Sequence, residues 1–296
     1  MKKNIVITGS SGFVGTHLSN ALKHSGMNVI GIDIRENSNY HGNFHKLDLN
    51  DPKIHDIIPD DSHVIHLGAI SNDSEGRSNP LSTIDINLRA TAALIKTLNT
   101  KSNVSLTFAS SEWVYPEKID KSLDLETNSL SLEDLNSIYA MSKLVGENLI
   151  RSLADIPYAI YRFGIVYGPR KLPGSAPENI ANSITNSSSI TLGAAETSRR
   201  YIYIDDLISA LQIVDDKIFL QDNHVYNITG DDLISLQKVA ITASQVVQKE
   251  IEILDKGLDP SIRNPPNDKF KNISGWSPKT NFAVGLENCI NAMKES

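Results

Sequence analysis

The chain of 296 residues is predicted to adopt an α/β fold, with a doubly wound parallel sheet and a smaller C-terminal lobe. Three observations predict it. Strand-like and helix-like runs alternate up to residue 168, a glycine-rich loop joins the first strand to the first helix, and the pattern loosens beyond residue 168. Alternating strands and helices form right-handed βαβ units, so both faces of the sheet should be covered.

The predicted elements follow one another in the order that such a sheet requires. Short β-rich runs end at glycine or polar residues, helical runs show apolar spacing, and Gly26 stops the first helix. These patterns predict strands over residues 4–9, 28–34, 63–69, 104–111 and 158–168, and helices over 16–26, 83–99 and 137–154. Residues 116–136 are irregular and polar, and prolines follow residue 168.

The composition excludes several classes of protein. A net charge of −7 argues against a nucleic-acid partner, which needs a basic face, and no apolar run is long enough to cross a bilayer. The N-terminus lacks the apolar centre of a signal peptide. A single cysteine, Cys289, leaves no internal disulfide and fits a reducing compartment. We therefore expect a cytoplasmic protein that does not bind membranes.

The histidines do not suggest a metal site. His63 and His66 lie three residues apart in a predicted strand and should face opposite sides of it. His41 and His45 flank a glycine and are interpreted as ordinary loop residues. We expect no metal ligands among them.

The glycine-rich segment TGSSGFVG predicts a dinucleotide site. It places Gly9, Gly12 and Gly15 between the first strand and the first helix. Glycines there allow a tight turn and let a pyrophosphate approach the helix N-terminus, as in a Rossmann-type sheet. The second strand brings in Asp33, whose carboxylate accepts hydrogen bonds from a ribose 2′-hydroxyl and repels a 2′-phosphate, which favours NAD over NADP. Asp48 is a candidate for the adenine contact, with an exposed loop residue as the alternative.

The segment YAMSK supplies a candidate base. Tyr139 and Lys143 lie at i and i+4, so their side chains are neighbours on one helix face. A tyrosine ionises near pH 10, and a nearby ammonium together with the positive nicotinamide ring stabilises the phenolate. Alone, the pair also fits a surface helix. Downstream of a dinucleotide loop and of a serine that ends a strand, Ser111, it indicates catalysis.

On these residues the chain resembles the extended short-chain dehydrogenase/reductases, the NAD-dependent nucleotide-sugar epimerases and dehydratases, with UDP-glucose 4-epimerase as the type. The similarity runs nearly end to end, through TGSSGFVG, HLGA, NLRAT, ASSEWVYP, YAMSK, YRFGIVYGP, SRRYIYIDDL, VYNITG and ISGWSPKT. It implies an NAD-binding domain over 1–167, with a return segment at about 200–228, and a substrate-binding lobe over 168–199 and 229–296. It also implies a homodimer, paired through helices 83–99 and 137–154 in a four-helix bundle.

The resemblance assigns a role to each matching residue. Ser111 is then the catalytic hydroxyl, Tyr139 the base and Lys143 the residue that binds ribose. Arg199 and Arg263 correspond to contacts with the nucleotide diphosphate. Phe13 and Val14 would meet the pyrophosphate through backbone N–H groups, and Asn227 falls in a segment that supports the fold. The full set of implied cofactor contacts is Gly9, Gly12, Phe13, Val14, Gly15, Asp33, Asp48, Leu49, Leu67, Ala69, Asn87, Tyr139 and Lys143.

Two departures from the family pattern concern the sugar. Ile165 stands where the family has an asparagine that reaches the substrate, so the sugar must be held otherwise, with Asn179 as the candidate. Tyr115-Pro116 replaces the commoner Tyr-Gly, which is similar to GDP-sugar epimerases of the fucose and mannose pathways. Those enzymes carry a cysteine where this chain has Trp113.

Glu112 is the least expected residue of the segment. Dehydratases and decarboxylases of this group carry a glutamate at the position of Trp113, and Glu112 is level with the aspartate that glucose 4,6-dehydratases use as their acid. Elimination needs both an acid and a base, and this chain has a residue at the position of the acid but a tryptophan at the position of the family's glutamate. We therefore expect Glu112 to bind a sugar hydroxyl or a bound positive group, with Trp113 closing the pocket. A solvated carboxylate at a strand end is the alternative.

The function favoured by the sequence is a nucleotide-sugar 4-epimerase that transiently oxidises C4 of a nucleotide-diphosphate hexose. By the resemblance, the phenolate of Tyr139 takes a proton from a sugar hydroxyl, hydride passes to NAD, and Ser111 hydrogen-bonds the developing ketone. The hydride then returns to the other face. The alternatives are a 4,6-dehydratase or decarboxylase, a keto-sugar reductase, and a regulator that binds NAD without catalysis. Retention of Ser111, Tyr139 and Lys143 together argues against the regulator.

Overall fold

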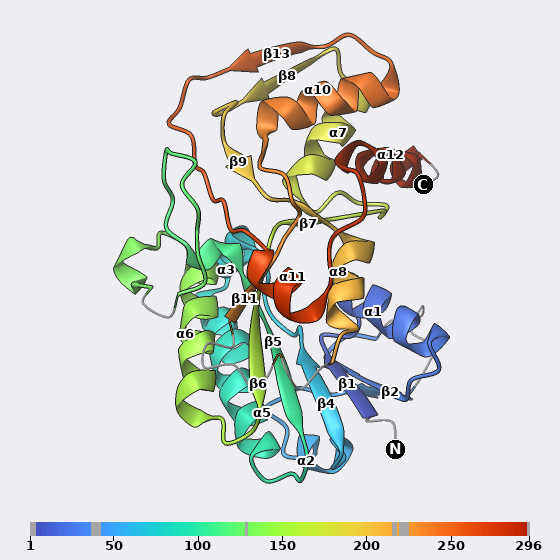
Figure 1. Cartoon of the computed structure of the whole chain (residues 1–296), viewed down its shortest axis with the longest axis vertical. Helices are drawn as coiled ribbons and strands as arrows, with labels where there is room; N and C mark the ends of the chain where they lie inside the picture. Colours follow the sequence, from blue (N-terminus) through green and yellow to red (C-terminus); the bar gives the residue numbers. More distant parts are fainter. Residues whose placement is uncertain (1–3, 37–42, 128–129, 215–217, 219–224, 295–296) are drawn as a thin grey trace. The chain divides into compact units, whose positions relative to one another are not determined.

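The computed structural model describes residues 4–36, 43–127, 130–214, 218 and 225–294 (Figure 1). Its main sheet consists of β1 (Asn4–Thr8), β2 (Val29–Asp33), β3 (Asn43–Lys46), β4 (Ser62–His66), β5 (Ser105–Ser111), β6 (Tyr158–Phe163) and β11 (Val225–Ile228). The order is β11-β6-β5-β4-β1-β2-β3, and β1 to β5 pair in parallel with their neighbours. The direction of the order changes at β1 and β4, where doubly wound sheets bind their ligands. The predicted fold class is confirmed.

Helices cover both faces of this sheet. They are α1 (Phe13–His24), α2 (Ile54–Ile57), α3 (Asp73–Ser78), α4 (Pro80–Thr83), the π-helical turn η1 (Ile84–Arg89), α5 (Ala90–Leu98) and α6 (Ile138–Leu153), with 3₁₀ turns η2 (Glu112–Val114) and η3 (Leu132–Asp134). In Figure 1, α5 and α6 lie together on one side of the sheet and α1 lies on the other. Leu94 and Leu98 of α5 and Ile150 of α6 are fully buried in one core with Leu106 and Phe108 of β5. This core fixes α6 against the sheet.

The structure changes two of the predicted elements and adds two strands to the main sheet. The strand expected over residues 158–168 is two strands, β6 and the short β7 (Val166–Tyr167), because Gly164 donates its N–H to Ile228 and Ile165 accepts from Ile202. β7 then pairs with β10 (Ile202–Tyr203) outside the main sheet. The helix expected over 83–99 begins at Pro80 and contains η1. Strands β3 and β11 were not predicted.

The chain forms two compact units. Unit 1 comprises Met1–Val114, Thr127–Arg162 and Leu211–Tyr226, and unit 2 comprises Tyr115–Glu126, Phe163–Ala210 and Asn227–Ser296. The further elements are α7 (Ala176–Asn186), β8 (Ser189–Leu192), β9 (Ser198–Arg199), α8 (Ile204–Leu211), β12 (Ile234–Ser235), α10 (Leu236–Val247), β13 (Glu252–Asp255), α11 (Asp268–Ser274) and α12 (Phe282–Lys294). β8 pairs with β13, and β9 with β12. The division into 1–167 with about 200–228, and 168–199 with 229–296, is a functional assignment and stays a prediction.

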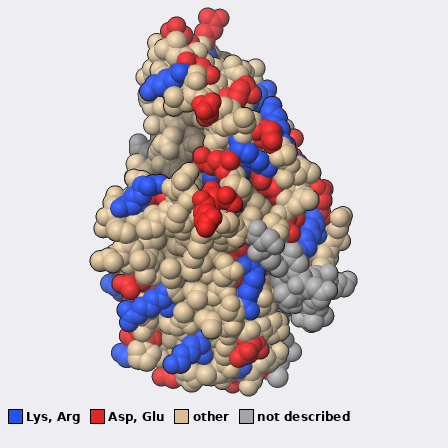
Figure 2. Space-filling model, turned by 90° about the vertical axis from the view of Figure 1, so that its left-hand side faces the viewer, with Lys and Arg blue, Asp and Glu red and all other residues tan. Residues whose placement is uncertain are grey.

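Two surface properties bear on possible partners. Within the described residues, no helix combines the length and apolar character that crossing a membrane requires. On the face that Figure 2 shows, Lys and Arg are interspersed with Asp and Glu and do not gather in one basic patch.

Candidate active site

The glycine loop joins β1 to α1 in a tight turn. Gly9 has a φ of 69°, and a Cβ on it would lie 2.6 Å from the backbone nitrogen of Gly68, in the loop after β4. A Cβ on Gly15 would lie 2.2 Å from the carbonyl oxygen of Gly9. Gly12 is the N-cap of α1 and makes no side-chain capping bond, and the first turn carries no acidic residue. The backbone of Phe13 therefore opens a helix N-terminus suited to an anion.

The carboxylate of Asp33 is built into the same loop. It is 7% exposed, and its two oxygens accept the backbone N–H of Ser11 at 3.0 Å and of Arg35 at 2.9 Å. It thus lies at the end of β2 beside the glycine loop, where the sequence predicts it. A carboxylate with its orientation fixed by two N–H groups suits a ribose diol.

The other implied cofactor residues lie near these strand ends. Asp48 is exposed and accepts from the backbone and side chain of Asn50, and Leu49 follows it, half-buried. Leu67 donates its N–H to the carbonyl of Thr8 in β1, and Ala69 follows in the same loop. The ends of β1 and β4 are therefore held together beside the dinucleotide loop.

Tyr139, Ser111 and Trp113 meet at the end of β5. Tyr139 is 9% exposed, its hydroxyl forms a hydrogen bond with Ser111, and its ring packs edge-on against Trp113 with centroids 6.1 Å apart. The Oγ of Ser111 accepts the backbone N–H of Trp113 at 3.2 Å. Burial raises the pKa of Tyr139, and the bond with Ser111 opposes this rise. The sequence-predicted pair of Ser111 and Tyr139 is thus brought together.

Lys143 lies one turn further along α6 and is also buried. Its Nζ donates to the carbonyl of Ala109 at 2.7 Å and lies 5.1 Å from the centre of the Phe108 ring. Burial lowers its pKa to about 8, and the charge of Glu147 opposes this shift. Burial and the charge of Lys143 lower the pKa of His66 to about 3, so His66 is neutral.

Glu112 is fully buried, directly after β5. It begins the turn η2, is 0% exposed, and its charge raises the pKa of Tyr139. The alternative of a solvated carboxylate does not fit this burial. Glu112 instead lies close enough to Tyr139 to influence its ionisation.

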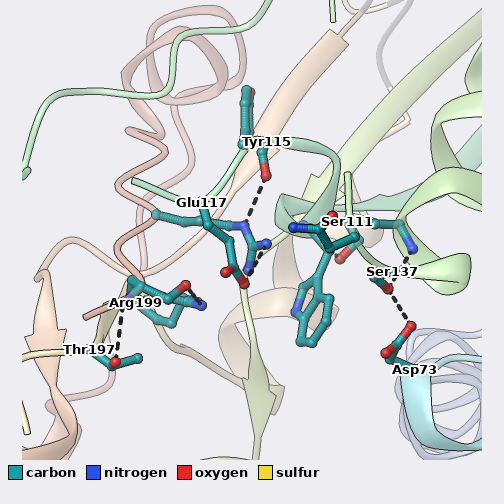
Figure 3. A network of polar contacts seen from close by, with 12 residues as sticks. Asp73, Ser111, Tyr115, Glu117, Ser137, Thr197 and Arg199 are labelled. Atoms are coloured by element: carbon teal, nitrogen blue, oxygen red, sulfur yellow. Dashed lines mark hydrogen bonds and ion pairs between the residues drawn. The ribbon is translucent and has the colours of Figure 1, made fainter. Parts of the chain in front are cut away.

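The start of α6 is fixed by a contact that the sequence does not reveal. Ser137 caps the helix by accepting from the backbone N–H of Ala140 at 3.1 Å, and its hydroxyl donates to Asp73 at 2.6 Å. Figure 3 shows Ser137 and Asp73 pointing toward one another. Arg77 bonds both Asp73 and the carbonyl of Asn136. Contacts with α3 therefore fix the first turn of α6, in which Tyr139 lies.

Asn87 links the loop after β4 to the catalytic helix. It is 3% exposed, accepts from the N–H of Ile70 at 2.8 Å, and donates to the carbonyl of Ile70 and to the Oγ of Ser142. Ser142 in turn donates to the carbonyl of Tyr139. The side chain of Asn87 therefore holds the loop that contains Leu67 and Ala69.

Unit 2 contains the predicted diphosphate residues. Arg199 is 6% exposed and donates to the carbonyls of Ser198 and Ser261 and to the Oγ of Ser261. Arg263 is 3% exposed and donates to the carbonyl of Tyr115 at 3.0 Å and to Glu117 at 3.3 Å (Figure 3). Both guanidinium groups are held rigidly within this unit.

Three other residues named from the sequence also lie in unit 2. Asn179 is an exposed residue of α7 whose amide donates to the carbonyl of Ser175. Ile165 is half-buried between β6 and β7. Asn227 is fully buried and bonds Tyr115 and the carbonyl of Asp124, as expected for a residue that supports the fold.

Histidine geometry agrees with the strand prediction. His63 contacts Ser105 and Thr107, whereas His66 contacts Thr8 and Thr91. The interpretation of His45 as a loop residue is wrong, because His45 pairs with Ile32 of β2 within β3; His41 lies outside the described residues. In the part of the chain that the structure describes, no group of three or more His, Cys, Asp and Glu is arranged to hold a metal ion.

The residues present fit NAD. The close approach of Gly9 to Gly68 leaves no room for a side chain in the loop, α1 begins without a side-chain cap, and Asp33 is oriented by two N–H groups. Together these are the parts that a dinucleotide requires at a helix N-terminus.

Comparison with known proteins agrees with this geometry. Residues 5–229 match the NAD dependent epimerase/dehydratase family. The chain is 25% identical to a UDP-N-acetyl-alpha-D-glucosaminuronate decarboxylase of Bacillus cytotoxicus, over 100% of this chain and 99% of the relative. It is 28% identical to the uncharacterized UDP-glucose epimerase YtcB of Bacillus subtilis, over 97% and 96%.

A solved structure shares the fold over nearly the whole chain. MoeE5 in complex with UDP-glucuronic acid and NAD superposes with a TM-score of 0.83 and 20% identity, over 99% of each chain. The family match covers most of the residues from β1 to β11. This chain therefore belongs to the NAD dependent epimerase/dehydratase family.

Proposed function

We propose that the protein is a nucleotide-sugar 4-epimerase that oxidises C4 of a nucleotide-diphosphate hexose transiently. One observation carries the proposal: Ser111 and Tyr139 are hydrogen-bonded at the end of β5, with Trp113 against the tyrosine ring. The position of Trp113 is the one where the dehydratases and decarboxylases of the family carry a glutamate. A tryptophan cannot move a proton beside a ketone, which favours epimerisation over elimination.

The residues of the chain divide the work as follows. The phenolate of Tyr139 accepts the proton of the C4 hydroxyl. Ser111, whose Oγ accepts from the N–H of Trp113, directs its own proton toward the oxygen that becomes the ketone. NAD, when bound, supplies the acceptor and donor of the hydrogen that leaves and returns to C4. Lys143 holds the ribose, and the positive charge at the site favours the phenolate.

Recognition of the substrate is assigned to unit 2. Arg199 and Arg263 are rigid, buried guanidinium groups, and such groups bind diphosphates in fixed geometry. Asn179 is the candidate for the sugar end, since Ile165 has no hydrogen-bonding group.

A survey of substrates tests the function directly. The protein is incubated with a panel of nucleotide sugars and NAD, and products are identified by NMR. The expected product is a C4 epimer, with no net change in NAD. Net reduction of NAD would instead indicate a dehydrogenase, and a 4-keto-6-deoxy sugar a dehydratase.

The second candidate is a dehydratase or decarboxylase. Glu112 favours it, because this fully buried carboxylate adjoins Ser111 and acts on Tyr139. One of the relatives is a decarboxylase. In this reading Glu112 is the proton donor, and the protein still transiently oxidises C4.

We also propose a homodimer in which α5 and α6 pair with their copies. Large apolar side chains are exposed on α6 and on the turns that lead into α5: Met141 is 36% exposed and Leu153 45% on α6, Leu81 76% on α4 and Ile84 49% on η1. Exposed apolar side chains on neighbouring helices favour association. Light scattering at micromolar concentration should give twice the mass of the chain, and a monomer would contradict the proposal.

A further inference from the structure

Three consecutive residues at the end of β5 each contact a different side chain of α6. The carbonyl of Ala109 accepts from Lys143 at 2.7 Å, the hydroxyl of Ser110 donates to Glu147 at 2.6 Å, and Ser111 bonds Tyr139. The proposed function uses the first and third contacts directly. It gives no role to the second, although Ser110 is the covalent neighbour of the catalytic serine.

The buried carboxylate of Glu147 is fixed by two arginines in addition to Ser110. Glu147 and Arg162 are both 0% exposed, and Arg162 of β6 makes two bonds to the carboxylate, at 2.9 and 2.7 Å. Arg151, one turn along α6, adds a third bond at 2.7 Å. Arg162 is itself held by the carbonyl of Thr127. These contacts fix the oxygen that receives Ser110.

Close packing between α6 and β5 makes this contact sensitive to small shifts. A Cβ on Gly146, next to Glu147, would lie 2.8 Å from the tip of the Phe108 ring. The helix therefore approaches the strand at the turn that carries Lys143 and Glu147. A small displacement of this turn moves Ala109, Ser110 and Ser111 together relative to Tyr139.

Glu147 also faces Lys143 electrostatically. Burial lowers the pKa of Lys143 to about 8, and Glu147 is the charge that opposes this shift. From β4, the neutral His66 faces Lys143, and β5 presents the Phe108 ring and the Ala109 carbonyl. Arg162 and Arg151 face Glu147 itself and hold its pKa below the usual value against burial. Glu112 acts at the other end of the helix, on Tyr139.

We propose that Glu147 is a positioning residue of the active site: through Ser110 it sets the place of Ser111, and one helical turn from Lys143 on the buried side of α6 it supplies the opposite charge for the Lys143 ammonium. It touches neither substrate nor cofactor. The proposal uses the assignment of Ser111, Tyr139 and Lys143 in the proposed function, so its test includes a measurement that needs no substrate.

The charge is tested by NMR titration of protein labelled with [¹³Cε]lysine, with the Lys143 signal assigned by Lys143→Arg. In the unmodified protein the signal should titrate near pH 8. Glu147→Gln keeps the shape but removes the charge, so the midpoint should fall by about one pH unit. Glu147→Asp keeps the charge, and its midpoint should stay near that of the unmodified protein. An unchanged midpoint in Glu147→Gln overturns the electrostatic role.

The positioning is tested by turnover of the nucleotide sugar that the product survey identifies. Ser110→Ala and Glu147→Asp both break the contact beside Ser111, so kcat should fall about tenfold while KM stays within about twofold. Arg151→Gln is the matched control, because it removes a partner of the same carboxylate but leaves Ser110, and its kcat should change less than about twofold.

A different result would contradict the positioning role of Glu147. If Glu147 only supports the fold, Ser110→Ala and Glu147→Asp lower the melting temperature while kcat per folded molecule stays that of the unmodified protein. If Glu147→Gln does not fold, Ser110→Ala decides the positioning role alone. The lysine titration is independent of the sugar, so failure of the proposed function leaves it readable.

Discussion

Two glutamates, Glu147 within α6 and Glu112 directly after β5, are both fully buried, yet they act on the ionisable side chains of α6 in opposite senses. Glu147 binds two guanidinium groups and raises the pKa of Lys143, which favours the ammonium form. Glu112 raises the pKa of Tyr139, which disfavours the phenolate. The same charge thus supports one member of the catalytic pair and opposes the other.

The difference shows that the protonated form of Lys143 and the ionised form of Tyr139 depend on different parts of the site. Burial lowers the pKa of Lys143 to about 8, and Glu147, whose carboxylate is bound by Arg162 and Ser110, opposes this fall. Burial and the charge of Glu112 both raise the pKa of Tyr139, so further positive charge is needed before Tyr139 ionises. The nicotinamide ring of NAD, the cofactor of this family, carries a positive charge and supplies it to the site only when NAD is bound. Four predictions test this comparison.

The largest effect is expected for Tyr139→Phe, which removes the group on which Glu112 acts. No other group at the site accepts the hydroxyl proton, so kcat should fall by about 10³-fold. Steady-state turnover measures the loss, and calorimetry should show that NAD still binds. Tyr158→Phe, in β6, serves as the control. Turnover within a few-fold of the unmodified protein would remove Tyr139 from its assigned role.

Asp33→Ala extends the comparison to a third buried carboxylate, which is oriented by backbone N–H groups. The change removes the acceptor for the ribose 2′-hydroxyl and the repulsion of a 2′-phosphate together. NAD affinity should fall at least about tenfold, whereas NADP affinity should change much less. Titration with both cofactors measures this. A preference for NADP in the unmodified protein would show that Asp33 is misplaced.

Glu112→Gln separates the two candidate functions. As a sugar contact, the amide keeps an acceptor, so KM should rise and kcat should fall only a few-fold. Loss of the charge lowers the pKa of Tyr139, so the acid limb of the kcat/KM profile should move to lower pH. In D₂O the product should contain no deuterium on carbon, because a 4-epimerase never releases that hydrogen to water.

A different outcome for Glu112→Gln would contradict its role as a sugar contact. A loss of about 10²-fold in kcat, together with deuterium beside the former C4 carbonyl, would identify a proton donor. The protein would then be a dehydratase or an enzyme that epimerises next to the ketone, and not a simple 4-epimerase.

The fourth prediction concerns the stability of the fold at His66, the neutral neighbour of Lys143. Its pKa is about 3 when folded and 6.5 when unfolded, so the unfolded chain binds the proton first as pH falls. This contribution to stability is complete above pH 6.5 and is lost as pH falls toward 3. Relative to His66→Gln, the unmodified protein should lose about 1.4 kcal/mol per pH unit in this window. Urea unfolding between about pH 4.5 and 6.5 measures the slope; equal slopes would contradict the burial of a neutral histidine.

Local patterns revealed the parts of the site that lie within one element or one turn. The glycine loop precedes a helix, Asp33 ends a strand, and Tyr139 and Lys143 share a helix face, so spacing alone was informative. The partners that fix these residues were not predictable. Asp73 and Ser137, or Glu147 and Arg162, come from elements whose adjacency depends on the folded sheet. A glutamate one helical turn after Lys143 looks in sequence like any solvated residue.

The break between β6 and β7 escaped prediction for a related reason. The run YRFGIVYG is apolar apart from Arg162 and the two glycines, so it resembles one buried strand, and only the hydrogen bonds of Gly164 and Ile165 to distant residues divide it. The assignment of Arg199 and Arg263 in unit 2 to the substrate rests entirely on family resemblance and stays a prediction, because a single arginine carries no local signal.

The π-helical turn η1 constrains how this chain can vary in length. A π-turn holds more residues than an α-turn, so Asn87 and the helix that follows occupy different α-helical registers. Deleting one residue between Ile84 and Arg89 would remove the π-turn and change the backbone around Asn87, while the α-helical segments on either side keep their relative orientation. The amide of Asn87 would then point away from Ile70 and Ser142, even though no catalytic residue had been changed. In this segment an insertion or deletion should be less tolerated than almost any substitution, and related chains that keep this contact should also keep the extra residue.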